Sequence, residues 1–140
     1  MTKPLIYRAA VIPYVIEDGI VKMMFMKPSN TQYGGDNFQI AKGRIEDGET
    51  AEQTARREGY EELGLREDNI LTFNELGVFL GRTTFYVVGV ADKTAFDQPH
   101  FETDETRWMT FEEFQKEGRD IHRSVVQSAM NLIEFAEGLI

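Results

Sequence analysis

The sequence has no cysteine. Disulfide bonds, thiolate metal sites and a cysteine nucleophile are therefore excluded. Its apolar runs are short, well below the roughly 20 residues that a membrane-spanning helix requires. The first residues, Met1–Leu5, do not form the charged and then apolar segment of an export signal. We expect a cytoplasmic protein that has no membrane partner.

Positive charge is also scarce. The chain has 15 lysines and arginines against 24 aspartates and glutamates, which gives a formal net charge of -9. Affinity for long nucleic acid is built from clusters of lysine and arginine, so no long nucleic acid is expected as a partner. A small anionic ligand is compatible with this charge if a divalent cation bridges it to the protein's carboxylates.

The 140 residues contain no internal repeat, low-complexity tract or linker, and we predict a single domain over residues 1–140. Aromatic and β-branched residues on either side of a tight turn at 17–19 predict a β-hairpin, in which Pro13 indicates an edge strand or a bulge. The predicted strands are 5–16, 20–27, 38–41, 70–80 and 83–91, with a return to the sheet at 107–109.

Two long loops and two C-terminal helices complete this prediction. Residues 28–37 and the acidic stretch 92–105 are rich in turn-forming residues and are expected as loops, the first of them over a site. Thr110 and Glu113 have capping-box spacing and predict a short helix, and Asp120 is expected to cap a second helix that runs to about residue 137. The expected buried stripe of this last helix is Ile121, Val125, Ala129, Leu132, Ile133 and Ala136.

The stretch Gly43–Leu65 carries more acid than a solvated helix face needs. Glu58 lies three and four positions before Glu61 and Glu62, so all three share one helix face and repel one another. The cost is only about 0.2–0.5 kcal/mol per pair on an exposed helix, and a hard divalent cation would turn the same cluster into a ligand set. An ordinary Arg57–Glu61 ion pair with solvated neighbours is the alternative.

The spacing of the whole stretch resembles the Nudix box. The matching positions are Gly43, Glu49, Arg57, Glu58, Glu61, Glu62, Gly64 and the apolar Leu65. Such a long motif favours the metal interpretation over the ion-pair alternative. One position departs from the family, because Gly59 stands where an apolar residue is usual, and a glycine inside a helix costs roughly 0.5–1 kcal/mol.

The resemblance implies a fold and a chemistry. The fold is α/β, a Nudix-type α/β/α sandwich with a mixed β-sheet and a loop-helix-loop catalytic motif. The chemistry is pyrophosphohydrolase activity on a diphosphate linkage, with Mg²⁺, or Mn²⁺, as cofactor. The roles carried over by position are metal ligation by Glu58, Glu61 and Glu62, orientation of Glu58 by Arg57, and support by Gly43, Glu49 and Gly64.

A second resemblance lies outside the box. Glu102, followed after four residues by Arg107-Trp108, is similar to a segment of diadenosine polyphosphate hydrolases and RNA 5′-pyrophosphohydrolases. There a glutamate from a distant loop reaches the metals, so Glu102 is the candidate for a further ligand or a general base. Asp104 and Glu105 are close rivals for that role, and all three are equally compatible with being ordinary loop acids.

Substrate contacts are predicted at three residues. Arg8 and Lys42 resemble phosphate-facing positions of the diadenosine polyphosphate branch, although that branch usually has proline where Ala41 stands, and Tyr33 could stack on a base. The favoured partner is thus a small nucleotide, a dinucleoside polyphosphate such as diadenosine tetraphosphate. The alternatives are an RNA 5′-pyrophosphohydrolase, an ADP-ribose or nucleotide-sugar pyrophosphatase, a non-catalytic nucleotide sensor and a structural domain.

Overall fold

The computed structural model describes residues 7–140. Leu5 and Ile6 of the predicted first strand, and the segment Met1–Leu5 considered for an export signal, lie outside the described residues. The strands are β1 (Arg8–Glu17), β2 (Ile20–Pro28), β3 (Ala41–Arg44), β4 (Ile70–Phe79), β5 (Thr83–Val90) and β6 (Thr103–Met109), and the helices are α1 (Ala51–Leu63), α2 (Phe111–Glu117) and α3 (Arg123–Ala136). Short 3₁₀ turns cover Glu67–Asn69 and Asp120–His122.

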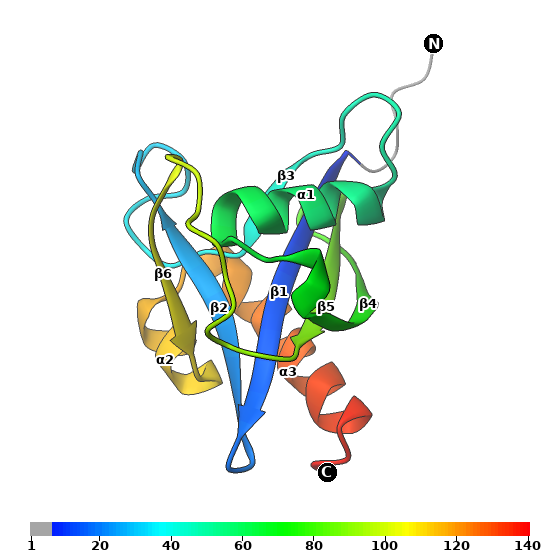
Figure 1. The fold of residues 1–140 in the computed structure, drawn as a ribbon. Coiled ribbons are helices and arrows are strands. Elements are labelled where there is room, and N and C mark those ends of the chain that lie inside the picture. The colour runs from blue at the N-terminus through cyan, green and yellow to red at the C-terminus, as the bar shows by residue number, and fades with distance from the viewer. Residues whose placement is uncertain (1–6) are drawn as a thin grey trace.

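The strands of this part of the chain form one mixed sheet. Its order is β4-β5-β1-β2-β6, and β3 pairs with the first half of β1. Only the β1–β5 pair is parallel among the pairs described, and the other pairs are antiparallel. Helix α1 crosses one face, and α2 and α3 cover the other (Figure 1). The predicted α/β class with a mixed sheet and helices on both faces is therefore what the chain forms.

Strand β1 supplies both cores because its side chains alternate between the faces. Ala9 and Val11 pack toward α1, whereas Ala10 and Ile12 pack toward α2 and α3, and all four are fully buried. The predicted hairpin is present, with Glu17 opposite Ile20.

The prediction that Pro13 marks an edge or a bulge is wrong, since β1 is the central strand. On one side of β1, the β3 pairing ends at Val11 and the β2 pairing begins at Tyr14. No residue of either strand is paired with Pro13 there. A residue without an N–H group is tolerated in the middle of this sheet because it falls between two ladders.

Two predicted strand boundaries are also wrong. Phe38 and Gln39 make only single bridges, to Gly118 and Met26, and the regular strand is β3, which begins at Ala41. β6 starts at Thr103, inside the stretch 92–105 that was predicted as a loop. Asp104 and Glu105 belong to residue types that are depleted in strands, and this segment becomes a strand through its pairing with the apolar β2.

The capping box of α2 is confirmed: Thr110 Oγ1 accepts from the Glu113 N–H at 3.2 Å and Glu113 Oε1 accepts from the Thr110 N–H at 2.8 Å. The Asp120 cap is wrong, because Asp120 lies in a 3₁₀ turn and α3 starts at Arg123 without a side-chain cap. Because α3 starts later than predicted, the set of buried residues along it also differs from the prediction. Val125, Val126, Ala129 and Ile133 are buried and Leu132 packs partly against them, whereas Ile121 and Ala136 are exposed.

Close packing explains why a glycine stands at position 59 inside α1. It is buried on the face of α1 that meets the sheet, and a Cβ there would lie 3.1 Å from both Val11 Cγ1 and Leu65 Cδ2. The missing side chain lets the helix approach β1 closely, which offsets part of the helix-propensity cost of a glycine.

No helix in residues 7–140 has the length and apolar character needed to cross a membrane.

Candidate active site

Helix α1 is fixed at both ends. Thr50 caps its start by accepting from the Gln53 N–H at 3.1 Å, while Gln53 Oε1 accepts from the Thr50 N–H at 2.8 Å. Gly64 ends the helix in the left-handed conformation with φ 76°, and a Cβ on it would overlap the carbonyl of Asp97. The carboxylates on the helix are therefore presented from a rigid element.

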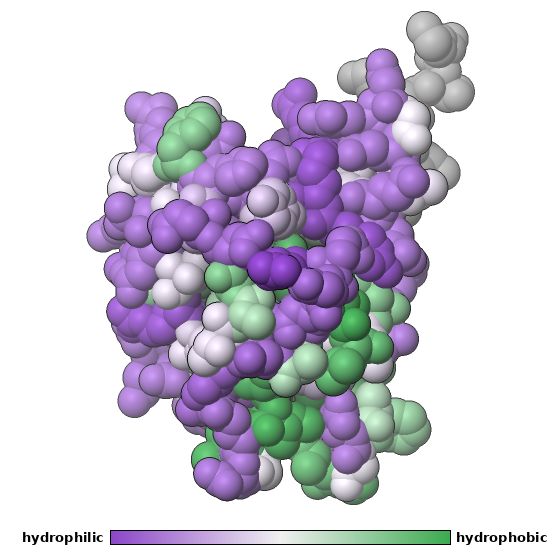
Figure 2. All heavy atoms as spheres, in the orientation of Figure 1, coloured by the Kyte–Doolittle hydropathy of each residue, from purple (hydrophilic) through white to green (hydrophobic). Residues whose placement is uncertain are grey.

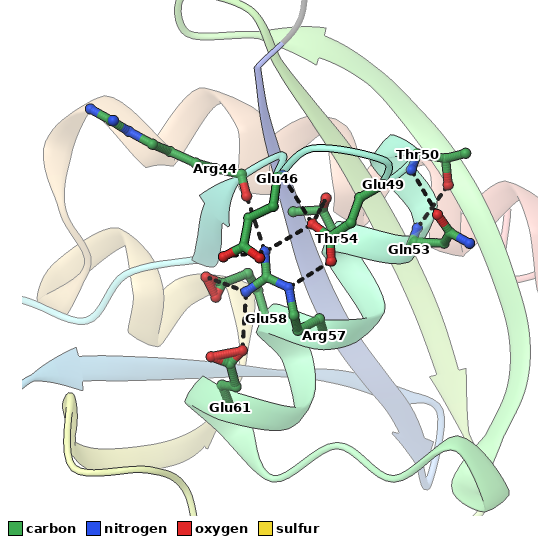
Figure 3. A network of polar contacts seen from close by, with 9 residues as sticks. All are labelled: Arg44, Glu46, Glu49, Thr50, Gln53, Thr54, Arg57, Glu58 and Glu61. Atoms are coloured by element: carbon green, nitrogen blue, oxygen red, sulfur yellow. Dashed lines mark hydrogen bonds and ion pairs between the residues drawn. The ribbon is translucent and has the colours of Figure 1, made fainter.

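Arg57 is the centre of the polar network drawn in Figure 3. Its guanidinium makes a two-pronged ion pair with Glu49, with Nε to Oε2 at 2.7 Å and Nη2 to Oε1 at 3.0 Å. Thr54 Oγ1 donates to the same carboxylate at 2.8 Å, and so does the Glu46 N–H at 3.1 Å. The hydrogen bonds from Arg57 in the first place, and then those from Glu46 and Thr54, lower the pKa of Glu49 to about 2. Glu49 thus remains ionised and holds Arg57 through this ion pair.

The other side of the Arg57 guanidinium faces the loop and the acidic helix face. Nη2 donates to the carbonyl oxygen of Arg44 at 3.1 Å, Nη1 donates to Glu61 Oε2 at 3.0 Å, and Nη1 lies 3.7 Å from Glu58 Oε1. The side chain of Arg44 extends away from this network (Figure 3). Arg57 is thus placed to orient Glu58 and to join the loop after β3 to α1.

Glu58 is only 9% exposed and lies directly against Gly43 of β3. A Cβ at position 43 would overlap the Glu58 carboxylate, so glycine is required there for the carboxylate to reach the sheet. Burial raises the pKa of Glu58 to about 7, against the opposing effect of Arg57, and repulsion from Glu61 and Glu102 adds to the rise.

Glu62 lies beside Glu58 on the same helix face. Its Oε1 accepts from the backbone N–H of Lys42 at 3.2 Å. Burial, and then repulsion from Glu58, nevertheless raise the pKa of Glu62 to about 8. Two neighbouring carboxylates are therefore held where ionisation is costly, with Arg57 as the cation nearest to Glu58.

The residues fit a bound divalent cation by the chemistry of their donors. Carboxylate oxygens are the ligands that Mg²⁺ and Mn²⁺ favour, and a cation would offset the cost of ionising Glu58 and Glu62 together. Within residues 7–140, no three acidic or histidine side chains already stand in a ready-made metal geometry. Glu61 is directed to Arg57 instead, so its participation requires its side chain to turn.

A pocket of about 690 Å³ opens beside these carboxylates. Figure 2 shows a polar notch at the upper edge of the molecule, where the loops after β2 and before β6 face the β3 side. The pocket is lined by acids on one side and by cations on the other: Glu58, Glu62 and Glu102, and Arg8, Lys42 and Arg44. None of the ion pairs among the described residues involves these three cations.

Alternation along β3 separates the two charges. Gly43 faces α1 and its glutamates, so its neighbours Lys42 and Arg44 belong to the opposite face of the sheet. The register places Arg8 of β1 opposite Arg44, which brings a third cation to the same end of the sheet. Burial lowers the pKa of Lys42, and the positive charges of Arg119 and Arg8 contribute in the same direction. A bound anion would favour the protonated form of Lys42.

The segment that carries Glu102 is fastened on both sides. Ser29 donates twice to it, from its N–H to the Glu102 carbonyl at 2.9 Å and from Oγ to the Phe101 carbonyl at 2.6 Å. Thr103 Oγ1 donates to the Glu62 carbonyl at 2.8 Å. These bonds connect Glu102 to the β2 end and to the last turn of α1.

The two rivals of Glu102 are placed elsewhere. Asp104 is exposed and does not line the pocket, and Glu105 is paired with Arg107 at 3.0 Å. The geometry thus favours Glu102, among these acids, as the group that faces Glu58 and Glu62.

A family model described as the NUDIX domain matches residues 7–129. This chain belongs to the Nudix family. The predicted family and fold are confirmed, and the prediction of a pyrophosphohydrolase agrees with this membership.

Solved Nudix structures show the same fold at low identity. The "Ap4A Hydrolase Binary Complex" of C. elegans superposes with a TM-score of 0.72 at 17% identity, and the alignment covers 90% of this chain and 96% of that one. The NUDIX domain of Shewanella oneidensis NrtR complexed with ADP ribose has a TM-score of 0.67 at 14% identity, covering 94% and 90% of the two chains.

A local sequence match also exists. It is to the "RNA pyrophosphohydrolase" of Tolumonas auensis, 46% identical over 39 residues, which is 28% of this chain and 22% of that protein. This chain therefore matches less than a quarter of the length of that protein.

The pocket of this chain also contains residues that the sequence did not single out. Ser29, Arg44 and Phe101 line it, but none of them has a distinctive spacing to a known motif. The alternation of β3 could have placed Arg44 beside Lys42, whereas Ser29 and Phe101 become neighbours only through the folding of two distant loops. Tyr33 also lines this pocket and is 72% exposed, and its contact with a substrate base stays a prediction.

Proposed function

We propose that this Nudix chain is a metal-dependent hydrolase of a diphosphate linkage in a nucleoside polyphosphate, and that a dinucleoside polyphosphate such as diadenosine tetraphosphate is its favoured substrate. The observation that carries the proposal is the pocket with a carboxylate side and a cationic side. Hydrolysis of a phosphoric anhydride needs a metal-holding side and groups that bind the phosphates.

The acidic side would hold Mg²⁺ or Mn²⁺ through Glu58, Glu62 and Glu61, with Glu102 as a fourth donor or as the general base. When bound, the metal neutralises charge on the phosphate oxygens and acidifies the attacking water. Arg57 keeps Glu58 oriented through its contacts with Glu49 and with the Arg44 carbonyl. These residues set the position of the scissile bond relative to the helix.

The cationic side would bind the phosphates on the far side of that bond. Arg8, Lys42 and Arg44 line the pocket in a chain of net charge -9, so they supply a local attraction for a polyphosphate at this end of the sheet. A substrate with several phosphates uses both sides of the pocket, whereas a simple diphosphate uses fewer of these groups. This supports a polyphosphate over ADP-ribose or a nucleotide sugar.

RNA with a 5′-triphosphate is the second candidate. It is favoured by the local match to an RNA pyrophosphohydrolase, while the fold neighbour named as an Ap4A hydrolase is in keeping with the first candidate. Net acidity weighs against RNA because a long polyanion must approach the rest of the surface as well.

The test is a panel of nucleotides incubated with Mg²⁺ or Mn²⁺ in ¹⁸O-labelled water, with the products identified by mass spectrometry. Diadenosine tetraphosphate and triphosphorylated RNA are compared at equal enzyme concentration, and Glu58→Gln is the inactive control. Turnover of the dinucleotide that is lost in Glu58→Gln is expected. If Glu58→Gln left all turnover unchanged, the carboxylate mechanism would be wrong.

Binding without turnover would instead indicate a nucleotide sensor. Calorimetry then shows nucleotide affinity that does not depend on the metal, and no product forms. A structural domain predicts neither binding nor a rise in melting temperature with Mg²⁺, because a ligand that binds only the native state must stabilise it.

A further inference from the structure

Phe101 is an anomaly on the surface. It is 88% exposed, the most exposed large apolar side chain among the described residues. Exposing a full phenyl ring forgoes the gain that its burial would bring. Its position is not arbitrary, because it lines the pocket and directly precedes Glu102.

The backbone at Phe101 is held firmly although the ring is free. Ser29 Oγ donates to the Phe101 carbonyl at 2.6 Å, and the Ser29 N–H donates to the next carbonyl, that of Glu102, at 2.9 Å. An apolar ring on an anchored backbone is preorganised to receive a flat partner without a large ordering cost.

A second exposed aromatic residue lines the same pocket. Tyr33 is 72% exposed and comes from the loop after β2, the loop that Ser29 begins. Its carbonyl accepts from Gln39 Nε2 at 2.8 Å, which fastens that loop to the chain entering β3. Two anchored segments, joined through Ser29, thus each present an aromatic ring at one pocket.

We propose that Phe101 is a substrate-binding residue whose ring stacks on the nucleobase of the substrate, with Tyr33 as a second aromatic contact at the same pocket. This inference rests on the proposed function and assigns its base subsite. Stacking accepts any base through its π-face and is stronger for the larger purines. Phe101 therefore selects nucleotides by the area of the base ring, and its side chain makes no hydrogen bonds to base edges. Selection by phosphate number is left to the cationic side of the pocket.

The test compares Phe101→Ser and Phe101→Trp with the wild type. Loss of one stacking ring raises KM for a purine nucleotide substrate by about 5- to 150-fold while kcat stays within about 3-fold, and Phe101→Trp restores KM. Phe135→Ser is the matched control, because Phe135 is also exposed, at 76%, but lies on α3 away from this pocket. Circular dichroism and melting temperature verify that each variant is folded.

A base-free probe separates stacking from displacement of Glu102. Inorganic tripolyphosphate is used as a competitive inhibitor, and its Ki is expected to be the same in Phe101→Ser and in the wild type. An unchanged KM in Phe101→Ser, a rise in Ki that parallels KM, or a loss confined to kcat would each overturn the proposal. Absence of turnover by the wild type refutes the proposed function instead, and stacking is then decided by the calorimetric Kd of AMP, which must weaken in Phe101→Ser.

Discussion

Replacing Glu62 by glutamine should stabilise the metal-free protein while abolishing its response to Mg²⁺. Burial and repulsion from Glu58 raise the pKa of Glu62 from 4.5 to about 8, so the folded state resists ionisation of a group that the unfolded chain ionises freely. Glutamine removes this difference because it carries no charge in either state. Its Oε1 can still accept from the Lys42 N–H, as Glu62 does at 3.2 Å.

The gain in stability expected for Glu62→Gln follows from the raised pKa of Glu62. A pH of 7.5 lies about three units above the pKa of this carboxyl in the unfolded chain, whereas in the folded protein the group is still largely protonated. Each pH unit of that difference corresponds to about 1.4 kcal/mol of stability. The upper value is about 4 kcal/mol, and partial access of water to this half-buried side chain reduces it, so we expect about 2–4 kcal/mol. For a chain of this length that is a rise in Tm of roughly 8–16 °C.

Urea unfolding in EDTA at pH 7.5 and pH 5 measures the gain. Because the folded pKa is raised, the destabilisation by Glu62 is absent below pH 4.5 and grows as the pH rises toward 8, so the advantage of Glu62→Gln must shrink at pH 5. Adding Mg²⁺ at about 100 times its Kd stabilises the wild type by about 2.7 kcal/mol. The variant should gain little. Glu112→Gln, at an exposed position on α2, is the control for a generic loss of charge.

Two results would refute this reasoning. One is a metal-free Glu62→Gln protein that is less stable than the wild type at pH 7.5, which would mean that the ionised carboxylate is well solvated or paired. The other is an equal Mg²⁺ response in both proteins, which would remove Glu62 from the ligand set.

Three further predictions address other parts of the molecule. Gly43→Ala places a Cβ on the Glu58 carboxylate, so turnover should fall by about 10²-fold or more with the circular dichroism spectrum unchanged, and normal kcat would contradict this. Thr103→Val removes the donor to the Glu62 carbonyl beside Glu102, and kcat should fall by about 2- to 10-fold at unchanged KM in steady-state kinetics. Burial first, and the nearby cations second, lower the pKa of His122 from 6.5 to about 3, so the unfolded chain binds a proton that the folded one excludes. The free energy of unfolding should then fall by about 1.4 kcal/mol per pH unit below pH 6.5. Urea unfolding of His122→Gln should lack this contribution to the pH dependence. Equal pH dependence in the variant and the wild type would refute the assignment to His122.

Local signals in the sequence predicted most of the fold. The β1–β2 hairpin, the strands on both sides of Gly81 and the α2 capping box are encoded within a few residues of each other, and they form as expected. The errors occur where long-range pairing decides. Pro13 is central because two ladders meet there, and β6 begins at Thr103 because β2 lies beside it.

The candidate site likewise has a part that local sequence signals predict and a part that depends on long-range contacts. The box spacing placed Arg57 and Glu58 on one helix with Glu49 in the loop before it, and the structure joins the three through hydrogen bonds and ion pairs. The choice among Glu102, Asp104 and Glu105 could not be made from a short pattern, because it depends on the bonds from Ser29 and Thr103 that fix this segment against β2 and α1. Such contacts between distant loops leave no periodicity in the sequence.

The acids of the box are chemically identical in the sequence, yet the fold gives them opposite energetic roles. Glu49 has its pKa lowered to about 2 by Arg57 and two further donors, so its charge stabilises the native state. Glu58 and Glu62 have their pKa values raised to about 7 and about 8, so their charges oppose it. A carboxylate that the fold disfavours as an anion, held against Gly43 on a capped helix, is available to a cation that enters later. The direction of the pKa shift therefore separates the supporting Glu49 from Glu58 and Glu62, two of the glutamates proposed to hold the metal, in agreement with the roles that the resemblance implied by position.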